Sequence, residues 1–281
     1  MIERTLSLAG CQCHIAEWNA KAETIVLAFH GWLDNLASFE SLAQHMPNIR
    51  LIAIDFPGHG HSEHHKDGQV YYFLDGLYLI DDLIEQLGLQ QANLLGHSMG
   101  GAIASIYAGV QPKRVDKLVL IEALGPLTAP DEDCLHNFSQ SIKLRRAIKG
   151  KRKPIYSHFD EGLTARAEVS EIAPELIRPL VDRALVEIPE GHTWRADPRL
   201  RVPSLMRLTE AQVLAILANI DADCLVIEAN NGLLQQQNSE HFELRKKTIK
   251  SLEIIKLAGG HHIHLEKSSE IARLIQDFLT Q

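Results

Sequence analysis

The chain has 281 residues, with 28 Lys or Arg against 36 Asp or Glu, so its formal net charge is −8. This length suits one α/β domain of ordinary size with a modest insertion, and the acidic balance argues against a nucleic-acid partner because like charges repel. No apolar run approaches the roughly 18 residues that a membrane span requires, so we expect no membrane-spanning segment.

Short apolar runs alternate with helical patterns along the chain, which predicts an α/β fold with a mostly parallel sheet flanked by helices. The first 20 residues predict an antiparallel hairpin, and a helix is expected over residues 74–87, ended by Gly88. The buried strands are expected at residues 25–29, 49–54, 92–95, 117–121, 224–227 and 252–256. Two further helices are expected over residues 99–110 and from residue 268 onward.

Between the strands at 117–121 and 224–227 the strand rhythm stops and prolines become frequent. We interpret residues 126–206 as a helical cap inserted into a core made of residues 1–125 and 207–281. The basic run KGKRK at 149–153 is typical of a solvated surface, with carboxylate binding as the alternative. Substrate-binding residues cannot be assigned from the sequence. The candidates are His192, Trp194 and Arg195, and core packing is an equal alternative for Trp194.

A G-x-S-x-G pattern stands where the strand at 92–95 meets the helix at 99–110, with Ser98 at its centre. In so tight a turn, small residues on either side of the serine relieve crowding, and the turn lifts the hydroxyl above the sheet. The start of the helix also favours developing negative charge. We therefore predict Ser98 as a nucleophile. A serine cap with packing glycines is the alternative interpretation.

A serine nucleophile needs hydrogen-bond donors for the oxyanion that forms on the attacked carbonyl. His30-Gly31-Trp32 follows the strand at 25–29, and Met99 follows the serine itself. We assign the backbone N–H groups of Trp32 and Met99 to the oxyanion hole. The alternative for the first segment is a plain turn with a buried aromatic ring.

The serine also needs a base within hydrogen-bond reach. GGHHIHL follows the last strand and precedes the last helix, so a histidine comes after the nucleophile in chain order. His261 directly follows the glycines and is the predicted base, with His262 and His264 as alternates.

Four more histidines crowd the segment GHGHSEHH: His59, His61, His64 and His65. Nothing holds them on one face of a helix, and no carboxylate pattern flanks them, so we predict neither a metal site nor a cofactor. The four cysteines are scattered, and the N-terminal residues show no basic segment followed by an apolar run. We therefore expect free thiols, no signal peptide and a cytoplasmic location.

The segments HGWLDNLASF, DFPGHGHS, GHSMGG and GGHHIHLEK resemble those of the α/β-hydrolase fold family, over about residues 20–125 and 207–281. HGWLDN and GHTWRADPRLRVPSLMRLTEAQV are most similar to its serine hydrolase-like protein subgroup. The resemblance implies a structural role for residues 55–62. Dehalogenases and epoxide hydrolases of this family use an aspartate where Ser98 stands, so the serine implies acyl transfer.

The chain departs from the family pattern at the third member of the triad. The usual acid follows the strand at 224–227, but Gly232 occupies that position. Glu122 stands at the carboxyl end of the strand at 117–121, where catalytic groups of open α/β sheets gather, and some dehalogenases of this fold similarly carry their acid there. We predict Glu122 as the acid, within about 3.2 Å of His261 Nδ1. Glu228 is the rival, and a structural salt bridge to the cap is the alternative role for Glu122.

The predicted function is cleavage of a small or medium carboxylic ester or related acyl bond by Ser98, His261 and Glu122, with a small-molecule acyl substrate as the partner. Two alternatives stay open. One is a catalytically weak relative that binds a ligand under its cap, which the empty acid position favours. The other is C–C bond hydrolysis with the same residues. The sequence does not decide the natural substrate or the oligomeric state.

Overall fold

The structure is a computed structural model, and it is described for residues 1–236 and 239–281. Its main sheet has the strand order β1-β2-β4-β3-β5-β6-β10-β11. The pairings of β2 with β1 and with β4 are antiparallel, and those from β4 through β11 are parallel. The strands are β1 (Ile2–Leu8), β2 (Cys11–Trp18), β3 (Thr24–Phe29), β4 (Ile49–Ile54), β5 (Ala92–His97), β6 (Val115–Ile121), β10 (Asp223–Ala229) and β11 (Leu252–Leu257). The expected hairpin and mostly parallel sheet are confirmed.

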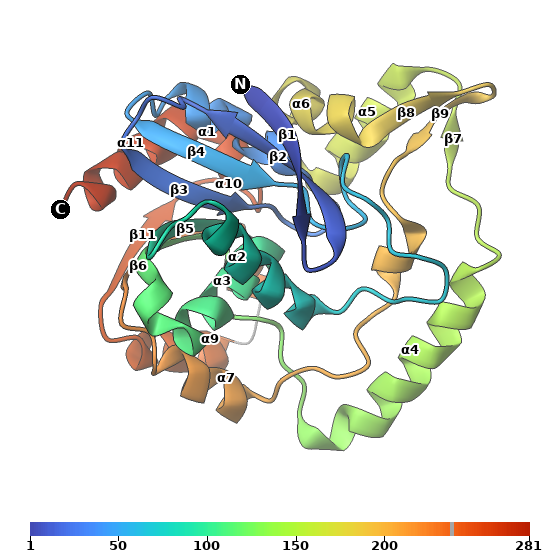
Figure 1. The fold of residues 1–281 in the computed structure, drawn as a ribbon. Helices are drawn as coiled ribbons and strands as arrows, with labels where there is room; N and C mark the ends of the chain where they lie inside the picture. Colours follow the sequence, from blue (N-terminus) through green and yellow to red (C-terminus); the bar gives the residue numbers. More distant parts are fainter. Residues whose placement is uncertain (237–238) are drawn as a thin grey trace.

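Helices cover both faces of this sheet (Figure 1). Alternate residues of β3 explain why its sequence is apolar throughout, since Leu27 and Phe29 belong to one buried cluster and Val26 and Ala28 to the other. The first cluster is closed by α2 (Gly76–Gln86), α3 (Met99–Val110), α7 (Glu210–Leu217) and α9 (Ser239–Thr248). The second is closed by α1 (Glu40–Gln44) and α11 (Ser268–Leu279). The short helices α8 (Leu233–Gln236) and α10 (Ile263–Glu266) follow β10 and β11.

The inserted cap is not purely helical. It contains α4 (Cys134–Ile148), α5 (Phe159–Ser170) and α6 (Pro174–Ala184), as expected, but also a small antiparallel sheet in the order β7-β9-β8. Its strands are β7 (Ile155–Tyr156), β8 (Leu185–Ile188) and β9 (Gly191–Trp194), followed by the 3-10 turn η5 (Pro198–Arg201). These strands are two to four residues long, too short for a visible alternation of apolar side chains.

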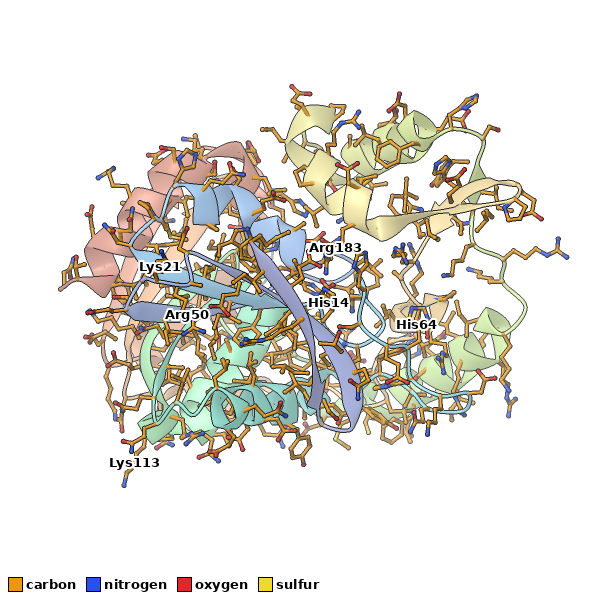
Figure 2. The ribbon with its side chains drawn as sticks, turned by 45° about the horizontal axis from the view of Figure 1, so that its top comes forward. His14, Lys21, Arg50, His64, Lys113 and Arg183 are labelled. Atoms are coloured by element: carbon orange, nitrogen blue, oxygen red, sulfur yellow. The ribbon has the colours of Figure 1, made fainter. Side chains whose placement is uncertain are left out.

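Buried charges join the cap to the core. Arg183 of α6 donates from Nε and Nη2 to Asp55 Oδ2 at 3.0 Å, and Asp55 is fully buried. Arg166 of α5 donates to Asp34 Oδ1 at 2.5 Å. Figure 2 shows Arg183 beside His14, where the cap meets the β1–β2 hairpin. These contacts fix the cap over the carboxyl ends of the parallel strands.

Two smaller expectations concern cysteines and membranes. All four cysteines are free in the structure, three of them buried. Within residues 1–236 and 239–281, no helix has the length and apolar character that crossing a bilayer demands.

Candidate active site

Ser98 lies in the turn between β5 and α3, with φ 51° and ψ −115°, a backbone conformation that non-glycine residues rarely adopt. The flanking glycines make this turn possible. A Cβ on Gly96 would lie 2.3 Å from Gly101 Cα, and one on Gly100 would lie 2.1 Å from the Phe29 carbonyl oxygen. The packing of β3, β5 and α3 therefore requires glycine at both positions and holds the serine in this strained turn.

His261 lies beside this serine after β11, with its Nε2 3.0 Å from Ser98 Oγ. At that distance the hydroxyl can donate its proton to the ring. The alternates are engaged elsewhere, His262 Nε2 with Asp34 Oδ2 at 3.3 Å and His264 Nε2 with Ser38 Oγ at 2.6 Å. Of the three histidines, His261 is the one that the structure brings to Ser98.

Glu122 is the carboxylate that faces the other ring nitrogen. Its Oε2 lies 3.4 Å from His261 Nδ1, slightly beyond the 3.2 Å that we expected, and it is 1% exposed. Its Oε1 accepts a hydrogen bond from the Ala229 N–H at 2.6 Å, which holds the side chain in place. Among the described residues, Glu122 forms no salt bridge to the cap, which was the alternative, because its contacts with His261 and Ala229 lie in the core. Glu228 instead bonds Gln235 and Lys256.

Gly232 explains how the acid can come from β6. A Cβ at this position would lie 2.0 Å from Glu122 Oε2, so any other residue would collide with the carboxylate. The glycine at the usual acid position and the glutamate on the neighbouring strand are therefore complementary. The sequence contains both residues, but their proximity is visible only in the fold.

Burial lowers the pKa of His261, although the hydrogen bond and charge of Glu122 oppose this shift. Nearby His97 lowers the pKa further. The ring is therefore mostly neutral at pH 7, which is the state that can accept the Ser98 proton.

Trp32 and Met99, which we predict to form an oxyanion hole, line the same cavity as Ser98. Met99 is the first residue of α3, where backbone N–H groups have no acceptor within the helix. The Trp32 indole donates to the Leu200 carbonyl at 3.0 Å and so joins the predicted oxyanion loop to the end of the cap.

The site opens into a cleft with two lobes beneath the cap. The first, of about 550 Å³, contains Ser98 and Glu122, and the second, of about 640 Å³, extends past Trp32 toward Tyr71. Eight residues line both lobes, which makes the cleft continuous: Trp32, Tyr72, Phe73, Asp75, Met99, Leu127, Ser204 and Arg207. Most of the lining side chains are apolar, as is common in sites that bind small molecules.

A buried histidine cluster lies behind His261, and it was not predicted from the sequence. His97 donates from Nε2 to the His261 carbonyl at 3.0 Å, so it fixes the backbone of that residue. Its Nδ1 faces Asp34 Oδ2 at 3.6 Å. Burial alone would raise the pKa of Asp34, but His262, His97 and Arg166 hold that pKa well below its usual range. The sequence signal that could have indicated this cluster was Asp34 in the HGWLD motif and His97 in the GHSMG motif.

Of the pocket candidates in the cap, Trp194 lines a separate cavity and packs against the apolar cluster of the cap. His192 contacts the ring of Phe159. The residues that line the two lobes beside Ser98 do not include His192, Trp194 or Arg195.

Residues 55–62 form the loop beside the cleft. Asp55 accepts hydrogen bonds from the Leu36 and His61 N–H groups, both at 2.8 Å, and a Cβ on Gly60 would lie 2.2 Å from its carboxylate. These contacts pack the loop against the core, as expected for a structural segment.

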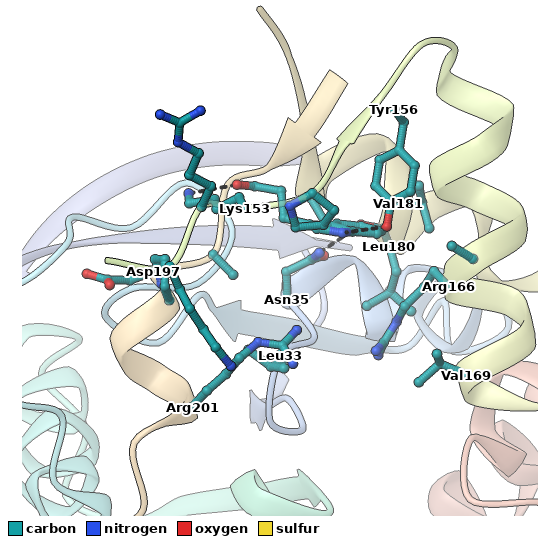
Figure 3. Close-up of a pocket in the computed structure, with 18 of the residues that line it drawn as sticks. Leu33, Asn35, Lys153, Tyr156, Arg166, Val169, Leu180, Val181, Asp197 and Arg201 are labelled. Atoms are coloured by element: carbon teal, nitrogen blue, oxygen red, sulfur yellow. Dashed lines mark hydrogen bonds between the residues drawn. The ribbon is translucent and has the colours of Figure 1, made fainter. Parts of the chain in front are cut away.

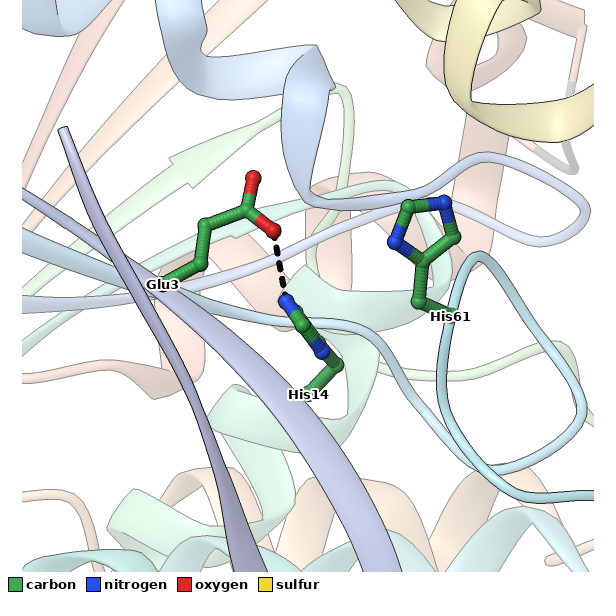
Figure 4. Close-up of side chains that lie close together, drawn as sticks. All are labelled: Glu3, His14 and His61. Carbon is green, nitrogen blue, oxygen red and sulfur yellow. Dashed lines mark hydrogen bonds and ion pairs between the residues drawn. The ribbon is translucent and has the colours of Figure 1, made fainter.

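Glu3, His14 and His61 form the group of potential metal ligands in the described part of the chain (Figure 4). Glu3 Oε2 lies 2.6 Å from His14 Nε2, and Glu3 Oε1 accepts from Arg183 at 3.0 Å. Because the guanidinium already supplies positive charge to this carboxylate, the group is poorly suited to a divalent cation.

Comparison with known proteins agrees with this fold. The family model described as the alpha/beta hydrolase fold matches residues 24–149. A serine hydrolase-like protein of Dictyostelium discoideum is 31% identical over 270 residues, covering 90% of this chain and 74% of the relative. The crystal structure of a hypothetical protein from Pseudomonas aeruginosa PAO1 is 34% identical with a TM-score of 0.94, and the match covers all of both chains.

A thioesterase domain from the curacin biosynthetic pathway is 25% identical, with a TM-score of 0.85, and the match covers 98% of this chain and 99% of that one. The sheet order, the insertion and these matches lead to one conclusion: the chain belongs to the α/β-hydrolase family, among its serine hydrolase-like proteins, and is a hydrolase.

Proposed function

We propose that this hydrolase uses Ser98 as a nucleophile to cleave a carboxylic ester or a related acyl bond. The observation that carries the proposal is the 3.0 Å approach of His261 Nε2 to Ser98 Oγ in a strained turn at the start of α3. This nucleophile–base pair, with a buried carboxylate on the far nitrogen of the base, is the arrangement that activates a serine.

In the first half of the reaction, Ser98 Oγ attacks the acyl carbon while its proton passes to His261 Nε2. The carbonyl oxygen becomes an oxyanion and accepts hydrogen bonds from the N–H groups of Trp32 and Met99. Glu122 accepts from Nδ1–H and stabilises the imidazolium. The bond to the leaving group then breaks, the leaving group takes the Nε2 proton, and an acyl-serine ester remains.

In the second half, His261 takes a proton from water as the water oxygen attacks the acyl-serine carbonyl. The bond to Oγ breaks, the proton returns to Ser98, and the carboxylic acid leaves. These steps need no cofactor or metal. The partner is a small-molecule acyl compound, and the cytoplasm is the proposed compartment because all four cysteines are free thiols.

The cleft supports a substrate with a hydrocarbon chain, because the 550 Å³ lobe at Ser98 is lined by side chains such as Leu127, Leu205 and Leu208. A thioester is a related candidate, supported by the similarity to a thioesterase domain at 25% identity. Both bonds would pass through the same acyl-serine.

A fluorophosphonate probe and a series of p-nitrophenyl esters test the proposal. We expect the probe to label the protein, Ser98→Ala to abolish labelling and hydrolysis, and medium-chain esters to be cleaved fastest. Ser105→Ala is the matched control, because that buried serine hydroxyl donates within α3 to Gly101. A folded wild-type protein that the probe leaves unlabelled would favour the ligand-binding alternative.

A further inference from the structure

Two arginines line the cleft without a carboxylate partner. Arg207 lines both lobes, and Arg201 lines the outer lobe. Neither side chain forms a hydrogen bond or an ion pair with any residue in 1–236 or 239–281. Arg199, two positions before Arg201, shows the contrast, since it donates from Nε to Asp197 Oδ1 at 3.1 Å and from Nη2 to Asp197 Oδ2 at 2.6 Å.

The carboxylate that lines both lobes does not neutralise these arginines. Burial raises the pKa of Asp75, and His65 and a backbone hydrogen bond from Tyr72 oppose this shift. No hydrogen bond or ion pair joins Asp75 to Arg201 or Arg207 in the described part of the chain. The wall of the apolar cleft therefore presents two cationic side chains whose charges are available to a ligand.

Arg201 also lines a third cavity, of about 410 Å³, in which more cations gather (Figure 3). Lys151, Arg152 and Lys153 line it as well, and so does Arg166, whose charge is already paired with Asp34. Lys153 Nζ donates to the carbonyls of Trp194 and Arg195, and Asp197 is the carboxylate whose charge acts on it.

The carboxylate that lines this third cavity is already engaged. Asp197 accepts from Tyr71 at 2.8 Å and from Arg199. Burial alone would raise the pKa of Asp197, but Arg199 and Tyr71 hold that pKa below its usual value. A chain with net charge −8 has thus concentrated positive charge at one end of its apolar cleft.

We propose that the substrate of Ser98 is an amphiphilic acyl ester or thioester. Its apolar part fills the cleft, and its anionic group, a carboxylate or a phosphate, binds Arg201 and Arg207. This assignment rests on the proposed serine hydrolase function. Guanidinium groups are suited to both anions because they donate two parallel hydrogen bonds. The basic third cavity would raise the local concentration of such a substrate and orient its charged end.

The two sources of the anion are distinguished by two matched substrate pairs. One pair is p-nitrophenyl hydrogen suberate and its neutral methyl ester, which differ by a carboxylate on the acyl chain. The other is octanoyl phosphopantetheine and octanoyl pantetheine, which differ by a phosphate on the leaving group. We expect the anionic member of one pair to have a kcat/KM about ten-fold or more above that of its neutral partner.

Arg201→Gln and Arg207→Gln remove one charge each and retain hydrogen-bond donors. Each is expected to lower the ratio of anionic to neutral kcat/KM by about three-fold, and the double variant should remove the preference. Arg273→Gln, on the exposed face of α11, is the control of equal charge and should leave the ratio unchanged. Equal rates for both members of both pairs, or a ratio unaffected by the double variant, would overturn the assignment.

Calorimetry with Ser98→Ala separates this inference from the proposed function. Binding of the preferred anionic compound should be about ten-fold tighter than that of its neutral partner and should weaken in the double variant. If the wild type hydrolyses nothing but this difference persists, the hydrolase proposal fails and the anion site stands. If neutral esters are cleaved through Ser98 without any anionic preference in rate or binding, the anion site fails alone.

Discussion

At the scale of single residues, the candidate triad has its acid after β6 and a glycine at the usual acid position after the neighbouring strand β10. Glu122 follows β6 with φ 52°, and Gly232 leaves room for its carboxylate beside β10. The carboxylate is fixed by a 2.6 Å hydrogen bond from the Ala229 N–H, so its orientation does not depend on the histidine alone. The 3.4 Å distance to His261 Nδ1 is long for a charged pair, as is common for catalytic contacts without substrate.

Glu122→Gln tests this acid with little change in shape. Without a carboxylate on Nδ1, the histidine loses both the favoured tautomer and the stabilisation of its imidazolium, so kcat should fall by about 10³-fold or more. Steady-state kinetics with a p-nitrophenyl ester measures this change in kcat. Glu228→Gln is the matched control, because that glutamate bonds Gln235 and Lys256 instead. A near wild-type kcat for Glu122→Gln would remove Glu122 from the triad.

The three histidines after β11 should differ sharply in their contribution to kcat. His261→Ala should lose about 10³-fold or more, since only binding and oxyanion stabilisation would remain. His262→Ala and His264→Ala should lose far less, because those rings contact Asp34 and Ser38 and not the nucleophile. Should His262→Ala prove the most impaired variant, the base has been assigned to the wrong residue.

The pH profile follows from the lowered pKa of His261. The base must be neutral, so kcat/KM should fall as the pH drops through a pKa below the ordinary 6.5 of histidine. Glu122 raises this pKa through its hydrogen bond and charge, so Glu122→Gln should move the acidic limb to still lower pH. A limb above pH 6.5, or one that moves upward in the variant, would contradict this account.

At the scale of elements, Asp34 joins three parts of the molecule. It follows the predicted oxyanion loop after β3, receives Arg166 from α5 of the cap, and faces His97 of β5 and His262 before α10. Asp34 is 3% exposed, so its charge is stable only while these partners surround it.

Asp34→Asn should destabilise the protein by about 3–5 kcal/mol at pH 7, because the partners of a buried charge are left uncompensated. Since the folded-state pKa of Asp34 lies well below its unfolded value, the charged pair stabilises the protein above the unfolded pKa. That stability is lost as the pH falls toward the folded pKa. Urea denaturation should therefore show the variant and wild type converging below about pH 4.

Arg178→Ala provides the control for this experiment. Arg178 also lies in the cap and pairs with Asp160, but the two side chains are 47% and 81% exposed. The pair should contribute less than about 1 kcal/mol. If Asp34→Asn is no more destabilising than Arg178→Ala, the buried cluster does not join cap and core.

At the scale of the whole molecule, cap and core share apolar contacts as well as ion pairs. The apolar cluster of the cap includes Leu163, Leu180 and Val181, and it also includes Leu265 from α10 of the core. Asn35 of the core donates to the Leu180 carbonyl at 2.9 Å. The cap is therefore packed onto the sheet edge and is not attached only by its two connections.

Leu180→Ala should accordingly lower the stability of the entire protein by about 2–5 kcal/mol, with a single unfolding transition. Leu180 is 2% exposed, so the change leaves a cavity at the junction of cap and core. Differential scanning calorimetry measures both the decrease in Tm and the number of unfolding transitions. Leu144→Ala, at an exposed position of α4, is the control. Two separate transitions would mean that the cap unfolds independently.

The sequence alone determined the strands of the core, the serine turn and the histidine that follows the last strand. These features depend on local rules, because alternation, glycine placement and chain order act within a few residues. It also indicated Glu122, since the carboxyl ends of parallel strands meet at one edge. It did not indicate α9, whose sequence SEHFELRKKT shows no clear apolar face, or the small sheet of the cap.

Only the tertiary structure decided which distant groups meet. Glu122 and His261 are 139 positions apart, Asp34 and Arg166 are 132 apart, and the Trp32 indole reaches a carbonyl 168 positions away. Such contacts depend on how helices and strands pack, and a pattern within one segment contains no information about its partner. The fit of Gly232 to Glu122 and the unpartnered arginines of the cleft become visible for the same reason, once packing has brought separate segments together.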